Sequence, residues 1–146
     1  DYSFSQDPKA FVHVGWTLST GALAESLVPK MAELTKKGYR DFIITGHSQG
    51  GAISYLVAAM LMEMNNANAW GEKLRIKTYA YAAPKAGNRF FAYDCENRTM
   101  GGWAFNIVNA SDWVPEVPFS IQTVNDFSQT NPFSDISGFI KQQKIS

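Results

Sequence analysis

The sequence predicts an α/β fold in which helices cover both faces of a mostly parallel sheet. Three short runs rich in apolar residues, at 41–45, 74–82 and 104–110, have the length and composition of strands. A long apolar segment without proline, residues 51–64, separates the first two and is typical of a buried helix. Strands that alternate with helices usually pair in parallel, because each helix returns the chain to the same end of the sheet.

A first helix is expected before the strands, over residues 27–38. Its apolar residues recur at helical spacing, two lysines lie in its last turn, and Gly38 is placed to end it. Pro29 lies inside this segment, and we expect it to kink the helix or to begin its second half.

The strands and the central helix follow in order. Residues 41–45 form a short apolar run bounded by turn signals, as in a buried parallel strand. Residues 51–64 are apolar on most faces, and residues 74–82 alternate between apolar and polar side chains. After Val114 the sequence is rich in Pro, Ser, Asn and Asp, which predicts loop, and a weak helical pattern closes the chain at 139–145.

Composition and charge exclude several classes of protein. The 146 residues are the size of one ordinary domain, and 45% of them are hydrophobic, which is enough for a core. The formal net charge of +0 argues against the basic surface of a nucleic-acid-binding protein. Cys95 is the single cysteine and cannot form an internal disulfide. No apolar run reaches the roughly 18 residues that indicate a membrane-spanning helix.

A serine lies between two glycines at the point where the first strand gives way to the central helix. Residues 46–50 read Gly-His-Ser-Gln-Gly, which is the G-x-S-x-G pattern of a nucleophile elbow. The turn must be sharp, so we expect Ser48 to be strained and its hydroxyl to project above the sheet. Gly46 and Gly50 should tolerate side chains badly, because a β-carbon would collide across the turn. A chance pattern is the alternative, but the flanking strand and helix favour the nucleophile.

Four motifs share an order and a spacing along the chain. They are VHVGW (12–16), TGHSQGG (45–51), YAAPKAGN (81–88) and NIVNASDWVPEVP (106–118). The set resembles the motifs of the class 3 lipases, which are fungal-type lipases of the α/β-hydrolase superfamily. The sequence departs mildly from the family pattern at four positions, Trp16, Gln49, Tyr81 and Ala82.

The resemblance implies roles for three residues. Ser48 corresponds to the nucleophile, and the backbone N–H of Gln49 to a donor of the oxyanion hole, whatever its side chain. Asp112 corresponds to the acid of the catalytic triad. The sequence pattern agrees, because catalytic groups gather at the carboxyl ends of parallel strands and Asp112 follows the strand at 104–110. The alternative for Asp112 is an ordinary turn aspartate.

The catalytic histidine is not evident. His47 directly precedes the serine, so its side chain should point away from that of Ser48, and His13 occupies a family position that we interpret as structural, at the start of the first helix. α/β-Hydrolases place their triad in the order Ser, Asp, His, and no histidine follows Asp112. The family's upstream oxyanion strand, F-R-G-T, is also not found. We therefore expect residues 1–146 to be one α/β-hydrolase-type domain, incomplete at both ends. A degenerate relative is the alternative.

Two classes of function remain open. The first is a serine ester hydrolase, a lipase or esterase that cleaves the carboxylic esters of lipids through an acyl-enzyme on Ser48. The second is a non-catalytic α/β-hydrolase-like domain that binds a lipid or a protein partner. We expect no cofactor and no metal, since the sequence has neither a Cys/His cluster nor a phosphate-binding loop. A lipid substrate implies transient contact with a lipid interface, and the resemblance favours a secreted or periplasmic protein.

Overall fold

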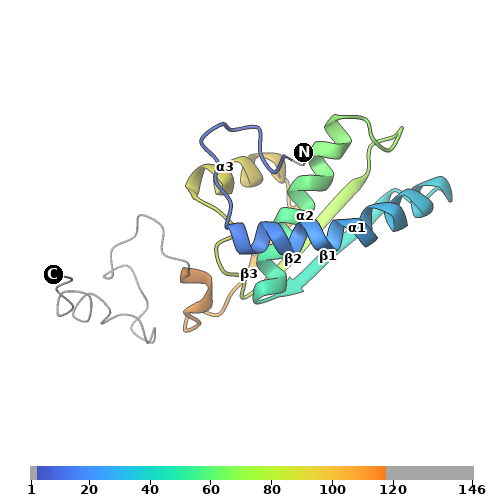
Figure 1. Ribbon diagram of the computed structural model, residues 1–146. Coiled ribbons are helices and arrows are strands. Elements are labelled where there is room, and N and C mark those ends of the chain that lie inside the picture. Colours follow the sequence, from blue (N-terminus) through green and yellow to red (C-terminus); the bar gives the residue numbers. More distant parts are fainter. Residues whose placement is uncertain (1–2, 118–146) are drawn as a thin grey trace, which may run out of the picture.

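The computed structural model describes residues 3–117 and confirms the α/β class (Figure 1). The helical pattern at 139–145 lies outside the described residues. No helix within the described range is long and apolar enough to cross a membrane. In chain order the elements are α1 (Val14–Lys36), β1 (Asp41–His47), α2 (Gln49–Asn66), β2 (Arg75–Tyr81), α3 (Arg89–Arg98), β3 (Ala104–Ile107) and a short 3-10 helix, η1 (Val114–Glu116).

The strands form one parallel sheet in the order β1-β2-β3. Phe42 pairs with Ile76 and His47 pairs with Tyr81, which pairs in turn with Ile107 of β3. Each crossover contains a helix, α2 between the first two strands and α3 between the last two, as parallel pairing requires. All three carboxyl ends therefore lie at the same edge of the sheet.

Within residues 3–117, helices cover one face of this sheet. Helices α1 and α2 pack on the face that carries Phe42 and Ile76, and Phe91 of α3 joins the core beside α2. The opposite face carries Ile43, which is 72% exposed, and Phe105, which is 42% exposed. The second covering layer that the sequence predicts is not among the described elements.

Helix α1 begins earlier than the sequence predicts, at Val14 rather than at residue 27. His13 caps it, because the ring Nδ1 accepts hydrogen bonds from the N–H groups of Gly15 (3.2 Å) and Trp16 (3.4 Å). The ring also stacks on the indole of Trp16, with 4.7 Å between ring centroids. The structural role predicted for His13 is therefore confirmed.

The end of α1 is as the sequence predicts. Gly38 has a φ of 94°, a left-handed conformation that glycine adopts without strain. The Gly38 N–H donates to the Thr35 carbonyl and the Tyr39 N–H donates to the Leu34 carbonyl. These bonds give partners to carbonyls of the last helical turn. Pro29 does not begin a helix, since α1 is continuous through it.

Helix α3 is missing from the sequence prediction because half of its residues are polar, and only Phe91 is buried. One signal for it is present in the sequence. Asn88 is the N-cap, and its side-chain oxygen accepts a hydrogen bond from the Phe91 N–H at 3.1 Å.

The N-terminal segment lies beside α3 (Figure 1) and is held there by hydrogen bonds to a network of ion pairs. Arg98 donates to the carbonyl of Phe4 at 2.9 Å and pairs with Glu63 of α2 and Asp94 of α3. Ser5 Oγ donates to the same Asp94 carboxylate at 2.8 Å. These three charged side chains are mostly buried, so each depends on its partners for its hydrogen bonds.

We predict that Thr78→Val leaves the free energy of unfolding unchanged or raises it by about 1 kcal/mol. Thr78 is fully buried in β2, and its hydroxyl has no hydrogen-bond partner among the described residues. Valine keeps the shape and removes the unsatisfied hydroxyl. Thr20 is the matched control, because it is equally buried but its hydroxyl donates to the Trp16 carbonyl at 2.8 Å.

Urea unfolding of both variants measures the difference, and Thr20→Val should gain no stability. If Thr78→Val lowers the free energy of unfolding by well above about 1 kcal/mol, the hydroxyl has a hydrogen-bond partner.

Candidate active site

Ser48 alone connects β1 to α2, so the turn is tighter than the five-residue turn that the sequence predicts. Its backbone angles are φ 54° and ψ −124°, a combination that non-glycine residues rarely adopt. The Ser48 N–H donates to the carbonyl of Tyr81 at 2.9 Å, and the Gly51 N–H donates to the carbonyl of Ser48 at 2.8 Å. The strained backbone predicted for a nucleophile elbow is confirmed.

The hydroxyl of Ser48 does not cap α2. A serine at this position ordinarily adopts an extended backbone and accepts a hydrogen bond from an N–H two or three residues later. Ser48 is not extended and makes no such bond. An ordinary capping role therefore does not explain why a serine stands here.

Gln49 is the first residue of α2. The first N–H groups of a helix have no acceptor within the helix, and the helix dipole places a partial positive charge at this end. The Gln49 N–H therefore lies at the positive end of the helix dipole, directly after Ser48. Its side chain is exposed.

The glycines of the elbow differ in how much they are constrained. A β-carbon at Gly46 would lie 2.1 Å from the carbonyl oxygen of Gly50, which confirms that this position tolerates no side chain. A β-carbon at Gly50 would meet nothing within 4 Å, so the expectation for Gly50 is wrong. The second constrained glycine is instead Gly51, where a β-carbon would lie 2.7 Å from that of Ala83.

We predict that Gly46→Ala lowers the free energy of unfolding by about 3 kcal/mol or more, because the clash is with backbone that cannot move aside. Gly50→Ala is the matched control within the same turn and should be neutral or slightly stabilising, since alanine favours the helix. Thermal and urea unfolding of the two variants test this. Equal losses in both would contradict the geometry described for the turn.

Asp112 lies beyond the carboxyl end of β3, at the same edge of the sheet as Ser48. The strand ends at Ile107, earlier than predicted, and the Asp112 N–H donates to the Asn109 carbonyl at 2.9 Å. One Asp112 carboxylate oxygen accepts from the Val114 N–H at 3.0 Å. The Asp112 side chain thus stabilises its own turn, as expected for an ordinary turn aspartate. It also lies at the sheet edge where an acid of the catalytic triad is expected.

Neither histidine joins these residues within the described part of the chain. His13 caps α1, and His47 ends β1 among the exposed positions of that strand. No hydrogen bond connects either ring to Ser48 or Asp112 in residues 3–117. Ser48, the Gln49 N–H and Asp112 lie at one sheet edge, and no histidine lies between them among residues 3–117.

Ala82 is a second strained residue at this edge, and its strain was not predicted from the sequence. It follows β2 directly, has a φ of 46°, and donates its N–H to the Ile107 carbonyl at 2.9 Å. The signal was its departure from the family pattern, which has glycine at this position. Glycine is the residue that adopts positive φ without strain.

We predict that Ala82→Gly is neutral or stabilising by up to about 1 kcal/mol, because relief of the left-handed strain outweighs the entropy that glycine loses on folding. Ala83→Gly is the matched control, since the neighbouring residue is buried and does not have positive φ, and it should destabilise. Thermal unfolding distinguishes the two. If Ala82→Gly destabilises as much as Ala83→Gly, Ala82 is not strained.

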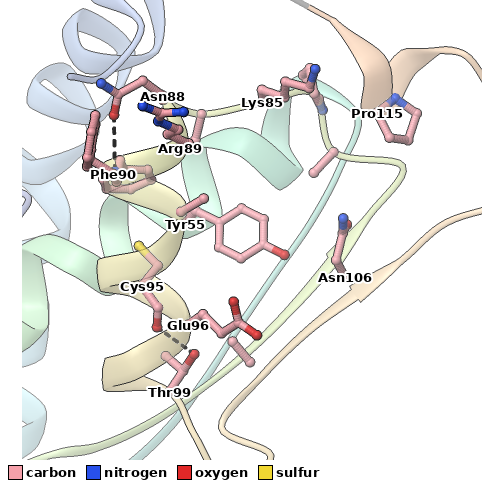
Figure 2. A pocket seen from close by; sticks show the side chains of 17 residues that line it. Tyr55, Lys85, Asn88, Arg89, Phe90, Cys95, Glu96, Thr99, Asn106 and Pro115 are labelled. Atoms are coloured by element: carbon pink, nitrogen blue, oxygen red, sulfur yellow. Dashed lines mark hydrogen bonds between the residues drawn. The ribbon is translucent and has the colours of Figure 1, made fainter. Parts of the chain in front are cut away.

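A cavity of about 790 Å³ lies between α2, α3 and β3. Tyr55 points into it, with Cys95 and Asn106 on its walls (Figure 2). Ser48, Gln49 and Asp112 do not line it. Burial raises the pKa of Tyr55 to about 12 and that of the Cys95 thiol to about 11, so both remain protonated near neutral pH. Cys95 is therefore not a competing nucleophile.

A strained serine between a parallel strand and a helix, with an aspartate beyond a later strand at the same edge, defines an α/β-hydrolase fold. The sequence model of the class 3 lipases matches residues 2–122. The chain belongs to that family.

Several proteins that are similar to this chain are named as lipases. The secreted mono- and diacylglycerol lipase 3 of Gibberella zeae is 36% identical over 106 residues, which cover 71% of this chain and 29% of the relative. The triacylglycerol lipase OBL1 of Ricinus communis is 32% identical over 80 residues, covering 53% and 15% respectively. The crystal structure of a lipase from Rhizopus microsporus var. chinensis matches with a TM-score of 0.60 and 30% identity, covering 77% of this chain and 38% of that one. The chain spans less than a third of the length of the two relatives named first.

Proposed function

We propose that this chain is the central part of a serine lipase domain and that Ser48 is its nucleophile. The observation that carries the proposal is the conformation of Ser48, the one residue between β1 and α2, which is strained and does not cap the helix. Strain of this kind persists where the surrounding structure enforces it, and it is concentrated at functional sites. Capping does not explain the serine, so its conformation favours a nucleophile over an elbow kept as architecture alone.

The proposed reaction begins with attack of Ser48 Oγ on the carbonyl carbon of an ester, while the serine proton passes to a histidine. The N–H of Gln49 stabilises the negative oxygen of the tetrahedral intermediate, helped by the N-terminus of α2. The intermediate expels the alcohol, which takes the proton from the histidine and leaves an acyl-serine. Water then attacks the acyl group by the same route and releases the carboxylic acid.

The general base is proposed to be a histidine other than His13 and His47, which are the two in these 146 residues. His13 is engaged as a helix cap, and its Nδ1 accepts two backbone hydrogen bonds. Asp112 would orient the incoming ring and stabilise its charged form. The ends of β1 and β3 are separated by one strand, so about 10 Å lies between them and leaves room for an imidazole.

The proposed substrate is an acylglycerol, since the relatives are named for mono-, di- and triacylglycerols. Access to such a substrate requires transient contact with a lipid interface. The name of the Gibberella zeae relative also supports a secreted protein. Side chains supply the nucleophile and the base in this scheme, and a backbone N–H supplies the oxyanion donor, so the proposal includes no cofactor or metal.

We predict that the protein expressed from the complete gene hydrolyses p-nitrophenyl esters and is labelled at Ser48 by a fluorophosphonate. Ser48→Ala should abolish the label and lower kcat by about 10⁴-fold or more, and Asp112→Asn should lower it by about 10²- to 10⁴-fold. Residues 1–146 alone should remain near background, because the base is absent. Asp41→Asn is the matched control, because this exposed aspartate lies at the opposite edge of the sheet, paired with Arg75.

Activity that survives Ser48→Ala would remove the nucleophile assignment. A complete protein that neither hydrolyses esters nor takes the label would instead support a binding domain that keeps the elbow as architecture.

A further inference from the structure

Asn88 forms hydrogen bonds with three backbone groups through one side chain. Its Oδ1 accepts hydrogen bonds from the N–H groups of Phe11 and Phe91, each at 3.1 Å, and its Nδ2 donates to the carbonyl of Lys9 at 2.8 Å. Figure 2 shows the bond to α3. The Asn88 N–H also donates to the Phe11 carbonyl at 2.8 Å. We call residues 9–13 the strap. Asn88 therefore links the strap to the start of α3.

The loop at 82–88 ends in Asn88, and the second half of this loop lies against the strap. The N–H of His13 donates to the Ala86 carbonyl at 2.9 Å, and Val12 forms an antiparallel bridge with Gly87. The approach is close, since a β-carbon at Gly87 would lie 2.4 Å from the Phe11 carbonyl oxygen. Without the Asn88 side chain, the Lys9 carbonyl and the Phe11 N–H lose the partner that aligns the strap with this loop.

The first half of the same loop contacts both candidate catalytic segments. Ala83 packs against Gly51, three residues after Ser48. The N–H of Ala82 donates to the Ile107 carbonyl at the end of β3, and the N–H of Lys85 donates to the Val117 carbonyl at 2.7 Å. The loop therefore touches the turn that holds Ser48 and both ends of the segment that carries Asp112.

We propose that Asn88 is a positioning residue for the reaction at Ser48. It fixes the 82–88 loop to the strap, and the loop fixes the relative placement of Ser48 and the Asp112 segment. The proposal rests on the proposed function. Asparagine suits the position because one amide supplies an acceptor for two N–H groups and a donor for a carbonyl, a combination that aspartate lacks. A displacement of about 1 Å at reacting groups can lower rates by about 10²-fold.

The test uses the complete protein and compares Asn88→Ala with Asn65→Ala. Asn65 is a matched control because its amide also bonds backbone, donating to the Leu74 carbonyl at 2.9 Å and accepting from the Leu74 N–H at 3.0 Å. That site lies at the amino end of β2, the edge opposite Ser48. All variants are assayed at a temperature where circular dichroism shows them fully folded.

We expect Asn88→Ala to lower kcat and the rate of fluorophosphonate labelling of Ser48 by about 10-fold to 10²-fold, with KM changed by less than about 3-fold. Asn65→Ala should lose thermal stability but keep both rates within about 2-fold of wild type. Asn88→Asp keeps the acceptor and loses the donor, so its rates should fall between those of wild type and Asn88→Ala. It also supplies the measurement if Asn88→Ala does not fold.

Two results would overturn the inference in distinguishable ways. If wild type is labelled and both Asn88 variants react as fast as Asn65→Ala, Asn88 serves stability alone and only this inference fails. If wild type neither hydrolyses esters nor takes the label, the proposed function fails and the inference fails with it.

Discussion

Reversal of the chain at a single residue, Ser48, is the constraint on which the rest of this structure depends. Such a backbone conformation costs about 1–3 kcal/mol and persists only where neighbours enforce it. The N–H of Ser48 is held by the Tyr81 carbonyl on the adjacent strand, and its carbonyl accepts the Gly51 N–H that opens α2. Gly46 allows the backbone of the helix to approach closely from the other side. The strain is therefore offset by the parallel pairing of β1 with β2 and by the burial of α2. Both are needed to hold Ser48 in this conformation.

The same burial explains which elements the sequence predicted well. Helix α2 and β2 supply most of the fully buried side chains, so their apolar patterns follow the fold and their bounds agree within two residues. Helix α3 buries only Phe91, and α1 begins with a histidine cap that no apolar period indicates. Where local hydrogen bonds rather than burial specify an element, hydrophobic periodicity has nothing to detect.

The candidate site also has features that the sequence predicts and features that it does not. Placement of Ser48 and Asp112 at one edge followed from strand order, and the strain at Ser48 followed from the motif. The steric roles of the glycines did not, because the direction in which each Cα–H points is a property of the folded turn. Gly50 faces open space, whereas Gly51 faces Ala83 of a loop 32 residues further along the chain. A contact of that kind is not encoded in the spacing of the motif itself.

Two backbone hydrogen bonds at the carboxyl edge of the sheet link Ser48 to the end of β3. The residue after β1, Ser48, donates to the last carbonyl of β2, and the residue after β2, Ala82, donates to the last carbonyl of β3. Both donors have positive φ, so β1 and β2 are each followed by a strained residue that is hydrogen-bonded to the next strand. The distance from Ser48 to the end of β3 is thus set by consecutive backbone bonds rather than by flexible loops. In the proposed mechanism, the histidine would therefore approach a serine whose position relative to the end of β3 is already fixed.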